Sequence, residues 1–195
     1  MNGFCCEPSQ SADTVVYELS AARWGGQEVA RRMRYVVRER IFSIGDDFWI
    51  TDEQGERAFL VDGKALRLRE TLELKDASGA VVATARKKLL SMRDTMEIEH
   101  DGAVVATVRR ALISPLRHRS VIDLADGGQL EAVGNILDKE FEIRGERGTV
   151  AWISRSWLSI RDTYAVEVAP GENDAFLLAI AVSLDRIHHD KRERT

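Results

Sequence analysis

The sequence predicts a mainly β domain, an antiparallel barrel closed around one C-terminal hydrophobic α-helix. From Tyr35 to about Val168, apolar and polar side chains alternate with the two-residue period of a strand that has one buried and one solvated face. The stretch Ala175–Leu184 is instead apolar on every side. A helix of that kind must be buried all round, and in one domain of 195 residues only an enclosing sheet offers such burial.

The predicted strands are short and are separated by tight turns. Alternation is clear at 66–75, 96–99, 104–108, 141–144 and 164–168. The residues that mark turns are Gly55, Asp62-Gly63, Ser78-Gly79, Asp101-Gly102, Asp126-Gly127-Gly128, Gly145, Gly148 and Pro170-Gly171. An Asp-Gly pair between alternating segments is a strong hairpin signal, because both residues tolerate positive φ. Many short strands joined in this way indicate a barrel or a sandwich.

The period changes after Pro170-Gly171, where a helix is predicted. Asn173 or Asp174 is suited to cap its first turn. We expect the apolar stretch to fill the barrel interior and the charged end, Asp185–Arg194, to emerge into solvent. His188 and His189 would then be favourable charges at a helix C-terminus. The large aromatic residues Trp49, Trp152 and Trp157 are expected to be structural and to lie in the core.

Two internal repeats support a barrel of similar halves. Leu90-Ser-Met-Arg-Asp-Thr95 recurs as Leu158-Ser-Ile-Arg-Asp-Thr163. Gly79-Ala-Val-Val-Ala-Thr84 recurs as Gly102-Ala-Val-Val-Ala-Thr107. Repeated strand-turn-strand units are typical of such folds. We interpret the Arg-Asp-Thr segments as structural, because Asp and Thr at a strand start hydrogen-bond the local turn.

Composition narrows the function and the compartment. The net charge is −4, which argues against a general nucleic-acid binder, since those carry a basic excess. Cys5 and Cys6 are adjacent, which excludes a secreted disulfide framework and favours a reducing compartment. No apolar stretch is long enough for a signal peptide or a transmembrane span. We therefore expect a cytoplasmic protein, peripheral at membranes if it binds lipid.

The domain boundaries follow from the same patterns. Residues 1–32 are small and polar and are expected to be a flexible extension. An alternative is that translation starts at Met33, shortly before the compact patterning begins. The barrel domain is predicted over residues 33–189 and a charged tail over residues 190–195.

The paired Lys88-Leu-Leu-Ser-Met-Arg-Asp-Thr95 and Ser156-Trp-Leu-Ser-Ile-Arg-Asp-Thr163 segments, the Gly-Ala-Val-Val-Ala-Thr strands and the final apolar helix together resemble the LURP-one-related family. The resemblance covers roughly residues 33–187. It implies the tubby C-terminal fold, a closed barrel of about twelve strands around a central C-terminal helix, and a relationship to phospholipid scramblases. Tubby domains bind phosphoinositides, but the residues they use have no recognisable counterpart here.

Motifs of catalysis and of cofactor binding do not occur. The sequence has no dinucleotide-binding glycine motif, no P-loop and no nucleophile elbow. His100, His118, His188 and His189 do not have metal-ligand spacing. We therefore expect no catalytic, cofactor-binding or metal-binding residues, and no enzyme.

One set of basic residues is a candidate site for an anion or a lipid headgroup. Its members are Arg86, Lys87, Lys88, Arg109, Arg110, Arg117 and Arg119. Charges on neighbouring strands could form one surface for anionic lipid. Two features weaken the hypothesis: Lys87 and Lys88 should point to opposite faces, and the acidic residues Glu97, Glu99 and Asp101 stand between the basic ones. The alternatives are a protein-interaction domain and a small-ligand carrier, although the helix should already fill the interior that a carrier needs.

Overall fold

The computed structural model describes residues 32–38, 47–63, 70–89, 91, 94–111, 118–155 and 163–192. The described residues form twelve strands and one helix within a compact unit of residues 31–195. The strands are β1 Met33–Arg38, β2 Phe48–Asp52, β3 Arg57–Gly63, β4 Thr71–Asp76, β5 Val81–Lys87, β6 Thr95–His100, β7 Ala103–Arg110, β8 His118–Leu124, β9 Gln129–Asn135, β10 Glu140–Gly145, β11 Gly148–Ser154 and β12 Thr163–Val168. The helix is α1, Asp174–Arg192.

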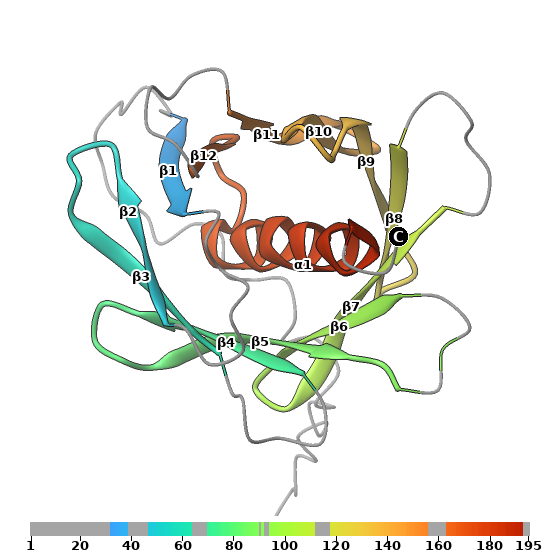
Figure 1. The fold of residues 1–195 in the computed structure, drawn as a ribbon, viewed down its shortest axis with the longest axis horizontal. Coiled ribbons are helices and arrows are strands. Elements are labelled where there is room, and N and C mark those ends of the chain that lie inside the picture. The colour runs from blue at the N-terminus through green and yellow to red at the C-terminus, as the bar shows by residue number, and fades with distance from the viewer. Residues whose placement is uncertain are drawn as a thin grey trace, which may run out of the picture. The chain divides into compact units, whose positions relative to one another are not determined.

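The strands form one closed antiparallel barrel, so the predicted fold class is confirmed (Figure 1). Each strand pairs with the next along the chain, and β1 closes the barrel against β12 through six residue pairs, from Met33 with Val168 to Arg38 with Thr163. The barrel has two ends. We call the end where even-numbered strands finish the turn end, and the end where odd-numbered strands finish the loop end. Helix α1 begins at the turn end and runs toward the loop end.

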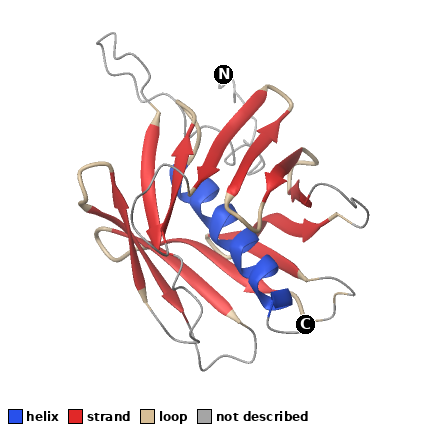
Figure 2. Ribbon diagram, turned by 45° about the horizontal axis from the view of Figure 1, so that its top comes forward, coloured by secondary structure: helices blue, strands red, loops and turns tan. Residues whose placement is uncertain are grey.

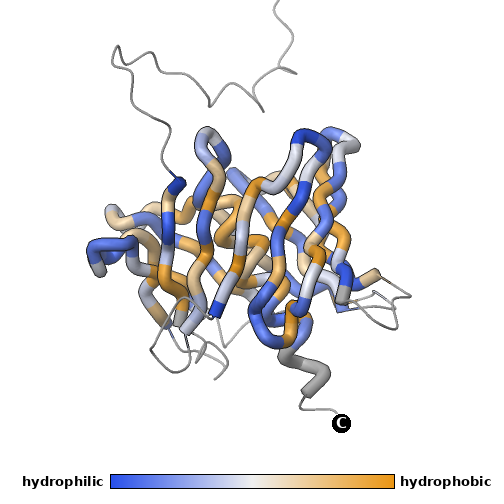
Figure 3. Tube along the Cα trace, turned by 90° about the horizontal axis from the view of Figure 1, so that it is seen from above, coloured by the Kyte–Doolittle hydropathy of each residue, from blue (hydrophilic) through white to orange (hydrophobic). Residues whose placement is uncertain are grey.

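Hydropathy alternates along the strands, as the sequence predicts (Figure 3). In β6, Met96 and Ile98 are buried at 1% and 0% exposure, while Glu97 between them is partly exposed. The two-residue period therefore separates an inner face against the helix from an outer face in solvent.

Helix α1 lies inside the barrel (Figure 2). The eight consecutive residues from 177 to 184 are each at most 4% exposed. Eight residues span more than two turns, so every face of the helix is buried, as predicted. Asn173 is the N-cap, because its side-chain oxygen accepts a hydrogen bond of 3.0 Å from the Phe176 N–H. No helix among the described residues has the length and apolar character that crossing a membrane requires.

A hydrogen bond fastens the start of the helix to β1. The Tyr35 hydroxyl donates to the Asp174 carboxylate at 2.9 Å. Burial, followed by the neighbouring carboxylate, raises the pKa of Tyr35 above its ordinary value. Burial likewise raises the pKa of Asp174, against the opposing effect of the hydrogen bond. The contact therefore joins the first strand of the barrel to the last element of the chain.

Equivalent hairpins at the turn end contain the predicted turn residues Gly55 and Ser78-Gly79, and each is closed by an aspartate that the sequence analysis did not single out. The turn predicted at Asp62-Gly63 is wrong, because both residues belong to β3 and pair with β4. In β2–β3 the Asp52 carboxylate accepts hydrogen bonds from the N–H groups of Gln54 and Glu56, both at 2.9 Å. Asp76 does the same in β4–β5 for Ser78 and Ala80. Hydrogen bonds, the largest from the Ser78 hydroxyl, hold the pKa of Asp76 below its ordinary value. These aspartates therefore fold the turns locally, without help from the core.

The sequence repeats correspond to repeated structure. Thr95 and Thr163 begin β6 and β12, and both are 5% exposed. The two Gly-Ala-Val-Val-Ala-Thr segments form β5 and β7, and each contains a β-bulge opposite its partner strand, between Leu74 and Lys75 or between Ile98 and Glu99. The repeats thus encode hairpins of the same shape.

The expected core position of two tryptophans is wrong. Trp49 and Trp152 are only partly buried and lie on the outer face, because their neighbours Phe48, Ile50, Ala151 and Ile153 fill the interior. Each carries an arginine over its ring, Arg57 at 4.9 Å and Arg32 at 4.0 Å from the ring centroid. Trp157 lies outside the described residues.

Gly134→Ala is expected to lower the free energy of unfolding by about 3 kcal/mol. Gly134 has a φ of 140°, and an added Cβ would lie 2.6 Å from the Glu140 carbonyl oxygen and 2.7 Å from the Phe141 Cα. Both atoms belong to the backbone of β10, which cannot withdraw without breaking its ladder with β9. Urea denaturation measures the loss.

Gly127→Ala is the matched control for this substitution. Gly127 also has a positive φ, 88°, but an added Cβ meets nothing within 4 Å. Its expected cost is therefore backbone strain alone, about 1 kcal/mol. Equal losses in the two variants would contradict the close approach of β9 and β10.

Candidate functional site

Six of the seven basic residues predicted as a lipid-binding set lie at the loop end of the barrel, within the part of its wall that strands β5 to β8 form. We call them the basic rim: Arg86, Lys87, Lys88, Arg109, Arg110 and Arg119. They belong to the end of β5 and the residue that follows it, the end of β7 and the start of β8, with β6 between β5 and β7. Arg117 lies outside the described residues. The fold thus brings the six together although they are spread along the sequence.

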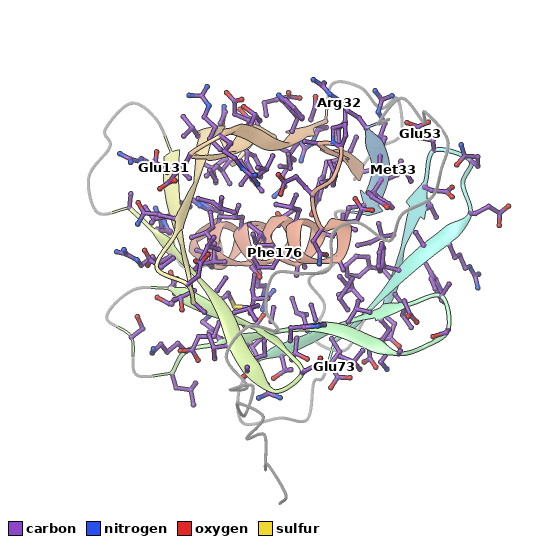
Figure 4. All side chains as sticks on the ribbon, turned by 180° about the vertical axis from the view of Figure 1, so that it is seen from behind. Arg32, Met33, Glu53, Glu73, Glu131 and Phe176 are labelled. Atoms are coloured by element: carbon purple, nitrogen blue, oxygen red, sulfur yellow. The ribbon has the colours of Figure 1, made fainter. Side chains whose placement is uncertain are left out.

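Four rim residues point outward, and each forms a cross-strand ion pair. The pairs are Arg86 with Glu99 at 2.8 Å, Lys88 with Glu97 at 2.8 Å, Arg109 with Asp123 at 2.5 Å, and Arg119 with Glu131. The Arg109 guanidinium, which donates to Asp123, holds the pKa of that carboxyl below its ordinary value. Figure 4 shows Glu131 on the outer side of the barrel, like Glu73. Of the three acidic residues that the sequence placed between the clusters, Glu97 and Glu99 therefore do face basic ones, whereas Asp101 lies in the turn between β6 and β7, at the turn end.

The other two rim residues, Lys87 and Arg110, share the inward-facing register of the core. Lys87 follows Ala85, and Arg110 follows Val108, both buried residues two positions earlier. Lys87 reaches Glu70 at 3.8 Å, and Glu70 also pairs with Arg186 of helix α1. Arg110, paired along the backbone with Ser120, forms no ion pair with another described residue. Lys87 thus faces inward and Lys88 faces outward, which are the opposite directions that the sequence predicts.

The charge balance of the rim follows from these contacts. Its six cations face five carboxylates, those of Glu70, Glu97, Glu99, Asp123 and Glu131. Exposed pairs of this kind contribute about 0–1 kcal/mol each and weaken with salt. Most of the charge carried by the six rim residues is therefore paired with carboxylates of the described residues.

A buried polar cluster lies inside the loop end, and sequence reasoning missed it. Lys139, at 5% exposure, forms an ion pair with Asp185 of helix α1, at 2% exposure. The Lys139 ammonium also lies 5.7 Å from the centre of the Tyr164 ring. Lys139 has a left-handed backbone, φ 59°, in the turn between β9 and β10, which aims its side chain at the helix.

A second buried contact lies beside it. The Ser120 hydroxyl and the His188 Nε2 are 3.1 Å apart, at 0% and 3% exposure. The expectation that the helix end from Asp185 onward emerges into solvent is therefore wrong for Asp185 and His188. Each stays inside because a barrel residue, Lys139 or Ser120, supplies a polar partner that replaces water.

These groups join helix α1 to the barrel wall and are closed to solvent. A Ser–His contact becomes nucleophilic only when substrate can reach the serine, and Ser120 has no exposed surface. No group of His, Cys, Asp and Glu side chains suited to a metal ion occurs in the described ranges. Little in the sequence indicates the buried Lys139–Asp185 ion pair, because the two residues are far apart along the chain and neither belongs to a known motif.

A small void lies between helix α1 and strands β3–β5. It has a volume of about 10 Å³ and is lined by Val61, Leu72, Leu74, Ala83, Ala85, Ala179 and Val182. That is scarcely the space of one water molecule, and the lining offers a water no polar partner. This void therefore gives no room for a carried ligand.

Comparisons with known proteins give one family model and several similar proteins. Residues 33–185 match the family model described as LURP-one-related. An uncharacterised Bacillus subtilis protein, YxjI, is 26% identical over 82% of this chain and 96% of its own length. Protein LURP-one-related 15 of Arabidopsis thaliana is 25% identical over 80% of each chain. An X-ray structure of an Arabidopsis thaliana protein superposes with a TM-score of 0.62 at 21% identity, covering 82% of this chain and 93% of that one.

Proposed function

The chain belongs to the LURP-one-related family, and on that premise we propose that its barrel is a non-catalytic binding module that contacts anionic phospholipid surfaces with the basic rim. None of the names of the relatives above indicates an enzymatic activity. The observation that carries the proposal is the convergence of six basic residues on one end of the barrel.

The ion pairs determine how such binding should behave. An unneutralised basic residue near an anionic membrane contributes about 1 kcal/mol. Five carboxylates offset most of the rim charge, so binding is weak and falls steeply with salt, over a Debye length of about 10 Å at 0.1 M. Contact with headgroup phosphates would have to replace some of these pairs. Arg110 is the first candidate, because it forms no ion pair with a described residue.

The proposal includes a cytoplasmic location for the protein. The cytoplasmic leaflet is the one rich in anionic lipid. A cytoplasmic protein that binds this leaflet peripherally is consistent with two adjacent cysteines, which rarely bridge each other, and with a helix that the barrel already encloses.

Vesicle co-sedimentation tests the proposal. We expect the full chain to sediment with vesicles containing about one third phosphatidylserine at low ionic strength, and to be released by about 0.2 M salt. Arg110→Gln/Arg119→Gln should reduce the bound fraction severalfold. Arg147→Gln is the matched control, because Arg147 is a highly exposed arginine (92%) at the turn end; its binding should be unchanged. Failure of the wild-type chain to bind would overturn the proposal.

A gain-of-function variant makes the test stricter. Glu97→Gln/Glu131→Gln removes two of the facing carboxylates and leaves every basic residue in place. If the rim is the contact surface, this variant should bind more tightly than wild type and need more salt for release. Unchanged binding by this variant would show that lipid contacts some other part of the chain.

A further inference from the structure

Four large apolar side chains of the described residues are exposed: Met33, Val81, Leu89 and Val104. Met33, Val81 and Val104 begin or nearly begin β1, β5 and β7, so they lie at the turn end. Leu89 follows β5 and lies at the loop end, next in sequence to Lys88 of the basic rim. It is also the most exposed of the four, at 57%.

The backbone around Leu89 is held where it leaves the barrel. The Lys87 N–H donates to the Glu70 carbonyl at 3.0 Å, and the Lys88 N–H donates to the Thr95 carbonyl at 2.9 Å. The Lys88 ammonium is in addition paired with Glu97 at 2.8 Å. Leu89 is the first residue beyond these contacts, so it projects from an anchored base rather than from a loose segment.

Solvent exposure of Leu89 gives nothing to the stability of the barrel. An apolar side chain gains free energy when it leaves water, in proportion to the area removed. An apolar group beside cations is the combination that peripheral membrane proteins use, because one weak signal alone does not hold a protein on a bilayer. Of the exposed apolar residues of the turn end, Val81 and Val104 lack this combination, since exposed carboxylates accompany that end: Glu53, Glu56, Asp101, Asp126 and Glu146. Met33 stands between the exposed residues Arg32 and Arg34, but both of these arginines pair with Glu167. Leu89 is more exposed than Met33 and adjoins the larger set of cations, the six residues of the basic rim.

We propose that Leu89 inserts into the acyl boundary of an anionic bilayer while the basic rim contacts the headgroups, so that the loop end faces the membrane. This inference rests on the proposed function. It adds to the surface charge interaction the depth of insertion, the one residue that inserts and the end of the barrel that faces the membrane.

Fluorescence from a probe at position 89 tests the insertion. In a Cys5→Ser/Cys6→Ser background, Leu89→Cys is labelled with the polarity-sensitive dye NBD and mixed with phosphatidylserine vesicles at low salt. We expect a blue shift and a rise in emission as the probe leaves water. Val104→Cys, labelled in the same way, is the matched control, because Val104 is 44% exposed at the turn end; its emission should not change.

An affinity measurement separates the two proposals. Leu89→Ser should weaken vesicle binding about tenfold, the equivalent of about 1.4 kcal/mol of lost apolar burial, with an unchanged dependence on salt. Val104→Ser should bind as wild type does. If the labelled chain sediments with vesicles but its position-89 emission stays that of water, the insertion is overturned and the rim contact stands. If no chain sediments, the proposed function itself fails.

Discussion

Leu178→Asp should abolish folding of the barrel. Leu178 has no exposed surface and lies in the second turn of helix α1, enclosed by the strands of the barrel. The substitution removes a buried side chain worth about 2–5 kcal/mol and adds an unpaired buried charge that costs several more. A domain of this size is stable by only about 5–15 kcal/mol in total. Circular dichroism should show loss of the cooperative thermal transition.

The matched control for this variant is Leu89→Asp, the same change at a leucine with 57% exposure. It should unfold within a few degrees of wild type, because its carboxylate stays in water. A cooperative, near-native transition of Leu178→Asp would mean that the helix is not enclosed in solution.

Lys139→Met should lower the free energy of unfolding by about 3–5 kcal/mol, because it leaves the Asp185 carboxylate buried without its cation. Both partners of this pair are almost completely buried, and methionine preserves most of the volume of the lysine chain. Chemical denaturation followed by tryptophan fluorescence gives the measurement.

The double variant Lys139→Met/Asp185→Leu distinguishes charge from packing. Replacing a whole buried ion pair by apolar side chains is often neutral or stabilising, so the double variant should recover most of the lost stability. If it is as unstable as Lys139→Met, the loss comes from packing around Lys139, and the ion pair is not what secures the helix.

The fold could be predicted because its signals are local. Alternation along β6 and β7 follows from the direction of successive side chains, and the apolar stretch Ala175–Leu184 has no other place to be buried. The turn predicted at Ser78-Gly79 is likewise local, because its hydrogen bonds to Asp76 come from residues no more than four positions away. Each of these features depends on residues that lie close together in the sequence.

The site could be predicted only in part, because its contacts depend on register. The sequence places Arg109 among other basic residues, but its partner Asp123 is set by the pairing of β7 with β8. The sequence predicts Asp185 at a solvated helix end. The lysine that neutralises Asp185 comes from the turn after β9, which is too far away in the sequence to be recognised as its partner. The sequence shows which residues are charged, but the register of the strands in the barrel determines which charges face each other.

The pairing of β1 with β12 has a consequence for how the protein is made. Arg32, beside β1, bonds to Glu167 across 135 residues of sequence, and the helix that fills the interior is later still in the chain. During synthesis the first eleven strands leave the ribosome with two unpaired edges and an unfilled centre. Contacts so distant in sequence make folding slow, and unpaired strand edges invite aggregation. The nascent chain should therefore depend on chaperones until helix α1 is translated.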